Sequence, residues 1–463
     1  MVYILTLPGS ELDGNQSEFL TEERLTKAFP KSALTGRRSG SAIVLVLSNG
    51  DGEGEKGVRH LRWMGVRARL GIAGRVDATI TVDPLKPCLM QIPIDGQSGL
   101  ASELSPDLRD EFRLASANIP VGICGQAVWD ALEQVLRRKY PRMAGVIDWL
   151  VLQATPPVFN EQDAADRFWQ ERWDGGKFLS RASGFPARIL TAWRRPRDRN
   201  ESFLAGVVPK PLERDLKSHD IRNLDIAFDM PEDRGQGRWS IHVLVDAFGR
   251  RLEVIDLNDG PVEGRTGTDV IYYHEPTQSF VLVQYKRLDQ GKKLMYVDGR
   301  FYDQLDRLEK VTGMSKAAAA PSEWRLGGDS CFIKLAHWHD KETENANTEL
   351  VPGMYLPISY LRLLLADDAT RGTRAGSAAR YIGYPTVERH LVNDQFVELV
   401  KHGLVGTVGV TREDLCQLVF DEVAAGMNVM VGIERSPETV RQRQARARRR
   451  GKPDRRYQHH VVR

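Results

Sequence analysis

The chain has 463 residues and a mass of 52.1 kDa, and its 65 Lys and Arg against 62 Asp and Glu give a formal net charge of +3. Hydrophobic residues make up 41% and charged residues 27%, which excludes a fibrous repeat, a mostly disordered chain and a membrane bundle. The length is too great for one ordinary hydrophobic core, so two or three domains are expected.

The N-terminal residues 1–155 are predicted to form an α/β domain of unknown role. Apolar runs favour strands at residues 2–7, 42–47 and 78–82. Ser105-Pro106 has the pattern of a helix start, and a second helix is expected over residues 125–140, where cations gather at the end. Thr155-Pro156-Pro157 is a plausible linker to the next domain.

A basic stretch interrupts this domain at residues 56–75. It contains Trp63 among four arginines, Arg59, Arg62, Arg67 and Arg69. Two interpretations stay open, a track that binds phosphates and a solvated face of a strand or helix.

Residues 156–345 alternate between helix and strand and predict an α/β core. A helix is expected over residues 161–183, with a weak point at Gly175-Gly176, and an insertion follows at about 186–238. Further on, the pattern predicts a helix at residues 302–311 and strands at residues 239–245, 252–257, 270–274, 280–287 and 331–335.

The C-terminal part divides into residues 346–434, predicted to be mainly helical, and a basic tail at residues 435–463. The tail carries 11 Lys and Arg against two acids, so the other 434 residues have a formal charge of −6. Such a tail can bind phosphates by releasing counterions, contact a protein partner or remain disordered. We favour a disordered tail that binds nucleic acid.

Three residues that carry chemistry are expected to converge on the strands at 270–274 and 280–287. Side chains alternate along a strand, so Gln284 and Lys286 share one face. A turn at Glu275-Pro276-Thr277-Gln278 would bring Asp269, at the start of the preceding strand, beside them. Asp269 and Gln284 could then hold Mg²⁺, or Mn²⁺ in its place, while Lys286 serves the attacking water and the phosphate.

The pattern Gly267-Thr268-Asp269, strand, turn, strand, Gln284-x-Lys286 resembles the PD-(D/E)xK nuclease core, and more narrowly its Mrr-type restriction endonuclease branch. The resemblance implies a central restriction-endonuclease-like mixed sheet flanked by helices. It also implies Mg²⁺-dependent hydrolysis of phosphodiester bonds, most often in double-stranded DNA.

A further glutamate from a helix is also implied by the resemblance. Glu171 fits this role, because Gly184-Phe185 follows it thirteen residues on. Glu253 and Glu263 lie nearer to Asp269 in the sequence and compete for the same role as a third acid.

The leading hypothesis is a metal-dependent DNA endonuclease, used in restriction or defence against phage. One alternative is a non-cleaving module that binds nucleic acid or protein on the same core, and another is a nuclease that acts on RNA. A protein partner or a homo-oligomer stays open.

Other chemistry is weighed against the nuclease hypothesis. A hydrolase of another class would use Cys124 or the pair His219-Asp220, and His337 with His339 offers a weaker zinc site.

The expected location is the cytoplasm. The cysteines are few and far apart, which suits a reducing compartment, and no two have C-x-x-C spacing. Neither a signal peptide nor an apolar run of about 18 residues is present, so no membrane partner is expected.

Overall fold

A computed structural model provides the structure of this chain. It describes residues 1–16, 19, 23–30, 41–50, 57–72, 77–117, 121–155, 157–160, 162–185, 187–190, 192–198, 201–208, 238–245, 250–258, 269–289, 291, 293–338, 350–372, 379–424 and 427–435. Within these ranges the fold is mixed α/β, with sheets of six, seven and two strands. None of the helices in these ranges has the length and apolar character to cross a membrane.

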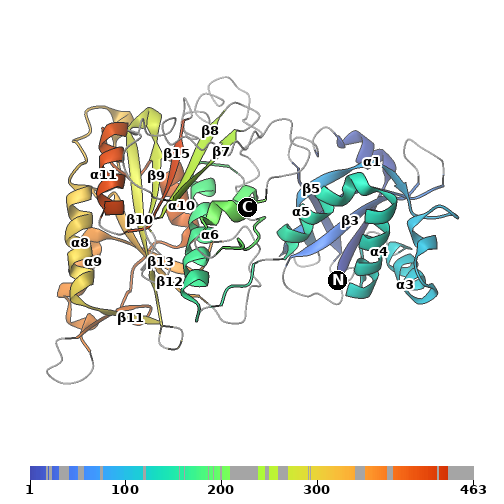
Figure 1. The fold of residues 1–463 in the computed structure, drawn as a ribbon, viewed down its shortest axis with the longest axis horizontal. Helices are drawn as coiled ribbons and strands as arrows, with labels where there is room; N and C mark the ends of the chain where they lie inside the picture. The colour runs from blue at the N-terminus through green and yellow to red at the C-terminus, as the bar shows by residue number, and fades with distance from the viewer. Residues whose placement is uncertain are drawn as a thin grey trace.

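The six-stranded sheet is built from the first part of the chain (Figure 1). Strand β1 pairs parallel with β3, and the other neighbours are antiparallel. In sheet order the strands are β2 (Leu25–Pro30), β5 (Asp77–Pro93), β4 (His60–Ile72), β3 (Ala42–Ser48), β1 (Val2–Leu7) and β6 (Val121–Cys124).

Apolar cores lie on both faces of this sheet. One face packs against the helices α3 (Pro106–Ala117), α4 (Gln126–Lys139) and α5 (Ala144–Ala154). The other face carries Trp63 and the short helix α1 (Gly9–Gly14). Apolar residues therefore run continuously along β1 and β3, because both of their faces are buried.

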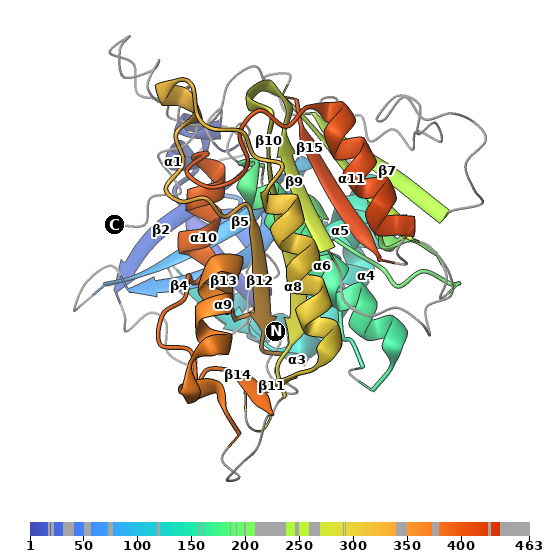
Figure 2. The ribbon, with the colours of Figure 1, turned by 90° about the vertical axis from the view of Figure 1, so that its left-hand side faces the viewer.

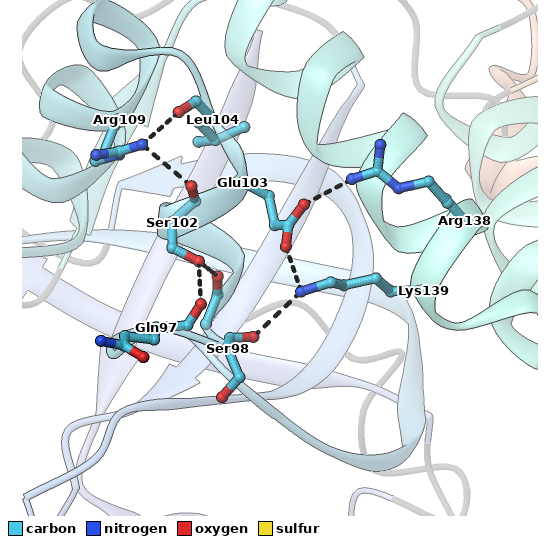
Figure 3. A network of polar contacts seen from close by, with 9 residues as sticks. Gln97, Ser98, Ser102, Glu103, Leu104, Arg109, Arg138 and Lys139 are labelled. Atoms are coloured by element: carbon cyan, nitrogen blue, oxygen red, sulfur yellow. Dashed lines mark hydrogen bonds and ion pairs between the residues drawn. The ribbon is translucent and has the colours of Figure 1, made fainter.

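Cations gather at the end of α4, as the sequence predicts, and they form ion pairs there (Figure 3). Glu103, in the turn η2 (Leu100–Glu103), lies 2.7 Å from Arg138 and 2.5 Å from Lys139. Arg109 donates to the backbone carbonyls of Ser102 and Leu104 at the same turn. The turn is therefore held between α3 and α4.

The seven-stranded sheet forms the centre of the larger unit (Figure 1). Strands β10 and β12 are parallel, as are β9 and β15, and the other neighbours are antiparallel. In sheet order the strands are β13 (Gly353–Pro357), β12 (Cys331–Ala336), β10 (Ser279–Arg287), β9 (Asp269–His274), β15 (Val429–Glu434), β8 (Arg251–Asn258) and β7 (Arg238–Val245).

Helices cover both faces of this sheet and make three layers (Figures 1 and 2). On one face lie α8 (Gly299–Thr312), α9 (Ile358–Ala366) and α11 (Arg412–Ala424), which share an apolar core with Ile271 and Leu282. On the other lie α6 (Ala164–Ala182) and α10 (Asn393–Lys401), packed against Val270 and Val283.

Residues 346–434 contain strands in addition to the helices that the sequence predicts. Helices α9, α10 and α11 lie there, but the same segment supplies β13 and β15 to the seven-stranded sheet. Strand β15 lies between β9 and β8, deep in the sheet. A strand buried on both faces reads as a continuous apolar run, and such a run does not by itself distinguish a strand from a buried helix.

The remaining elements are short. Strands β11 (Leu294–Val297) and β14 (Arg380–Gly383) form the two-stranded sheet. In the expected insertion at about 186–238, the described part holds the turns η4 (Ala187–Leu190) and η5 (Phe203–Gly206). Outside it, the chain makes the turns η3 (Pro141–Met143), η7 (Glu275–Thr277), η8 (Pro321–Glu323) and η9 (Asp368–Thr370).

Candidate active site

The hairpin of β9 and β10 sets Asp269 directly opposite Gln284. Its connection is the turn η7, after which Gln278 adopts a left-handed conformation with φ of 47°. Side chains directly opposite each other on an antiparallel pair project to the same face. Lys286 follows two residues after Gln284 and therefore projects to that face as well.

Asp269 and Gln284 are fully buried, and their oxygens are incompletely satisfied by the described residues. Both residues have 0% relative exposure. Within the described part of the chain, no donor meets a carboxylate oxygen of Asp269 or Oε1 of Gln284 in full hydrogen-bond geometry, although the Gln284 amide lies close enough to lower the pKa of Asp269. An unsatisfied buried polar group costs about 1–3 kcal/mol. These oxygens therefore suit a ligand that would satisfy them.

Two charged residues that the sequence analysis missed lie at the same place. Arg307 of α8 has its Nη2 3.7 Å from Oδ2 of Asp269 and its Nε 3.1 Å from Oε1 of Glu422, which belongs to α11. A signal for Glu422 was present, since it continues the apolar stripe of Leu415, Leu418 and Val419 on α11. An acid in such a stripe must find a partner or a function.

Burial shifts the pKa values of the site. It raises the pKa of Asp269, and the charges of Arg307 and Lys286 offset this only in part. Burial also raises the pKa of Glu422, to about 7, and the neighbouring carboxylate of Asp269 adds to this. Burial lowers the pKa of Lys286, against the opposing effect of Asp269 and Glu171. A divalent cation would favour the ionised carboxylates.

Glu171 lies on α6, which covers the opposite face of the sheet. Gly175 of α6 packs on Val270 and Leu179 on Gly432, so α6 runs parallel to β9 and β15, and Glu171 lies toward the Asp269 end. Its Oε1 is 2.7 Å from Nε of Arg287, the last residue of β10. Glu171 thus lies at the same end of the sheet as Asp269, where it forms an ion pair with Arg287.

Of the two other candidate acids, Glu253 lies in the described part of the chain and Glu263 does not. Glu253 pairs with Ile433, whereas Val429 lies beside Asp269. Four residues along a strand correspond to about 13 Å. Glu253 lies toward the other end of the sheet and pairs with Arg251 at 2.7 Å. Glu263 lies outside the described residues.

The remaining candidates from the sequence are Cys124 and the histidine pairs. The thiol of Cys124 is buried, and burial followed by the charge of Glu111 raises its pKa to about 12, so the nucleophilic thiolate is disfavoured. His219-Asp220 and His339 lie outside the described residues, and His337 is buried.

Strand β4 lies entirely within the basic stretch at 56–75, and Arg59, Arg62 and Arg67 have partners inside the protein. Arg59 lies 2.8 Å from Asp95, and Arg62 lies 2.7 Å from Asp13. Arg67 is buried, with its guanidinium 4.4 Å from the ring centre of Tyr3. These contacts argue against both a phosphate track and a solvated face, because the arginines stabilise the sheet. The basic tail after Arg435 lies outside the described residues.

The residues at this end of the sheet fit a magnesium ion. In the described ranges, no group of three or more His, Cys, Asp and Glu side chains is arranged to hold a metal. The donors here are instead the carboxylate of Asp269 and the amide oxygen of Gln284, with a second carboxylate nearby. Mg²⁺ takes oxygen ligands and usually only one or two carboxylates from protein.

Comparison of the chain with protein-family models, with curated proteins and with solved structures gives no match. Function must therefore be argued from the geometry and chemistry of the site itself.

Proposed function

We propose that this protein is a Mg²⁺-dependent endonuclease that hydrolyses phosphodiester bonds of DNA. The observation that carries the proposal is the pairing of Asp269 with Gln284, both buried with unsatisfied oxygens, and Lys286 two residues further on the same face. This is the Asp, Gln-x-Lys arrangement that resembles the Mrr-type nucleases.

The order of elements around the site supports a restriction-endonuclease-like core. Helix α6 precedes the strands and covers one face, and β9 and β10 carry the charged residues. Helix α8 then crosses the opposite face before β12 pairs parallel with β10. This gives a mixed sheet between helices, with the charged residues at one end of its central strands.

Each side chain has a role that its position suits. Asp269 and Gln284 would hold the ion, which, when bound, would polarise the phosphoryl oxygen and stabilise the leaving group. Lys286 is half-buried, and its lowered pKa makes its amine a better proton acceptor for the attacking water. In its charged form the same amine would neutralise the phosphate.

A cleavage assay tests this function. Purified protein is incubated with plasmid DNA and Mg²⁺, with EDTA as the metal-free arm and an RNA substrate in parallel. Lys286→Ala should lower the cleavage rate by about 10²-fold or more. DNA binding, measured with Ca²⁺ in place of Mg²⁺, should be retained.

Lys310→Ala is the matched control, because Lys310 is an exposed lysine at the end of α8. It should cleave as the wild type does. Equal nicking by the wild type and Lys286→Ala would contradict catalysis by this site. Binding of DNA without any cleavage would favour a non-cleaving module, and cleavage of RNA alone would reassign the substrate.

A further inference from the structure

The C-terminal end of α11 is tied by backbone hydrogen bonds to the start of β9. The N–H of Met427 donates to the carbonyl of Glu422 at 3.0 Å, and the N–H of Asp269 donates to the carbonyl of Asn428 at 3.0 Å. Asn428 immediately precedes β15, whose Val429 lies beside Asp269 in the sheet. The connection between α11 and β15 thus fixes Glu422 near Asp269.

The Glu422 side chain is buried and incompletely satisfied. It has 2% relative exposure, no donor within the described ranges satisfies its Oε2, and the Asp269 carboxylate lies close enough to raise its pKa. Its Oε1 lies 3.1 Å from Nε of Arg307. A buried carboxylate in an otherwise apolar stripe destabilises the fold unless something binds it.

The guanidinium of Arg307 lies where a metal ion bound by Asp269 and Glu422 would lie. Its guanidinium lies within 3.7 Å of Asp269 on one side and 3.1 Å of Glu422 on the other. Among the described residues, neither its Nε nor its Nη2 finds an acceptor in hydrogen-bond geometry. Arginine usually binds carboxylates through paired hydrogen bonds, so this arrangement compensates charge without the geometry of a structural pair.

A separate observation points to a ligand at the same place. The amide of Gln284 is fully buried opposite Asp269, and its Oε1 has no hydrogen-bond partner in the described structure. A neutral amide is not needed to compensate a charge. Its free oxygen supplies the third donor of an oxygen-lined site.

We propose that Glu422 is the second carboxylate ligand of this site and that Arg307 occupies the place of the cation until the metal ion binds. The inference rests on the proposed function, because it completes the site of the same ion. The second acid of the site is then a residue of α11, separate from the hairpin that carries Asp269 and Gln284.

Binding of Mn²⁺ alone to the full-length chain tests the inference without any cleavage step, with electron paramagnetic resonance reporting the free ion. Glu422→Gln should weaken Mn²⁺ binding by about tenfold or more, as Asp269→Asn should. Glu253→Gln is the matched control, since it neutralises another buried acid of the same unit, and should bind as the wild type does. Arg307→Gln should bind Mn²⁺ more tightly.

The outcomes separate the inference from the proposed function. If Glu422→Gln remains folded by circular dichroism and binds Mn²⁺ as tightly as the wild type, Glu422 is not a ligand, even if the wild type cleaves DNA. If Arg307→Gln binds Mn²⁺ more weakly than the wild type does, Arg307 does not occupy the place of the ion. A wild type that binds Mn²⁺ through Glu422 but never cleaves supports the inference and overturns the function. A wild type without Mn²⁺ binding overturns both.

Discussion

Two sets of buried charges lie on opposite faces of the seven-stranded sheet and differ in how they are satisfied. On the α6 face, Asp174 accepts hydrogen bonds from Lys334, from the Tyr285 hydroxyl at 2.9 Å and from the Val351 N–H at 2.6 Å. Burial alone would raise the pKa of Asp174, but the lysine charges outweigh it and lower the pKa. Asp269, on the other face, is incompletely satisfied by the described residues. A satisfied network stabilises a fold, whereas an unsatisfied one indicates a ligand site.

Glu171 offers a prediction at the same scale, because its ion pair with Arg287 gives it a role distinct from that of a ligand. Glu171→Gln should reduce the cleavage rate by about tenfold, as expected for a residue that positions Lys286 through its charge. Its Mn²⁺ affinity should stay within about twofold of the wild type. A large loss of Mn²⁺ affinity in Glu171→Gln would instead make Glu171 a metal ligand, as the sequence resemblance implies.

Among the elements, α6 shows how a residue with poor helix propensity can serve packing. The helix begins after Asp163, whose carboxylate accepts from the N–H of Ala165, and it continues through Gly175-Gly176. A Cβ at Gly175 would lie 2.8 Å from Cγ2 of Val270, next to Asp269 in β9. The weak point predicted from the sequence is thus the place where α6 comes closest to the strand of the site.

Gly175→Ala should destabilise the protein by about 1–3 kcal/mol, because the added methyl must displace Val270. This opposes the gain of about 1 kcal/mol that alanine offers over glycine within a helix. Gly299→Ala, at the start of α8, is the control, since a Cβ there meets no heavy atom within 4 Å. Urea denaturation measures both. Equal stability of Gly175→Ala and the wild type would show that α6 can move away from β9.

For the whole molecule, the two large sheets have their own apolar cores, and partly buried charges join the units. Arg188, which follows α6, pairs with Asp83 of β5 and lies 3.3 Å from Glu23. Gln153 of α5 donates to the carbonyl of Arg188 at 2.8 Å. The net positive charge of the chain is concentrated at the C-terminus. Residues 436–463 carry ten Lys and Arg against two acids.

Truncation after Arg435 should weaken DNA binding and reduce its salt dependence, because fewer counterions are released from the DNA. Arg435 itself is kept, since it lies 3.1 Å from Glu253. A tail of equal length with glutamine in place of each arginine is the control for length, and it should behave as the truncation does. Binding titrations at several salt concentrations measure the slope. An unchanged slope would leave the tail without a role in binding nucleic acid.

The sequence by itself determined the hairpin and the side to which its residues project. Strands β9 and β10 are adjacent in the chain, and the alternation of side chains is a local property of an extended backbone. Asp269, Gln284 and Lys286 could therefore be assigned to one face before any tertiary contact was known. The starts and ends of α4 and β12 and the end of α6 were similarly readable, because capping residues and apolar periodicity are local signals.

Only the tertiary structure decided what covers that face. Arg307 and Glu422 come from helices far along the chain, and β15 enters the sheet between β9 and β8. Pairing of this kind depends on how the complete chain buries its apolar surface, and no local pattern encodes the partner. The hairpin thus specified one carboxylate, one amide and one amine, while packing of the whole chain decided which distant charges stand beside them.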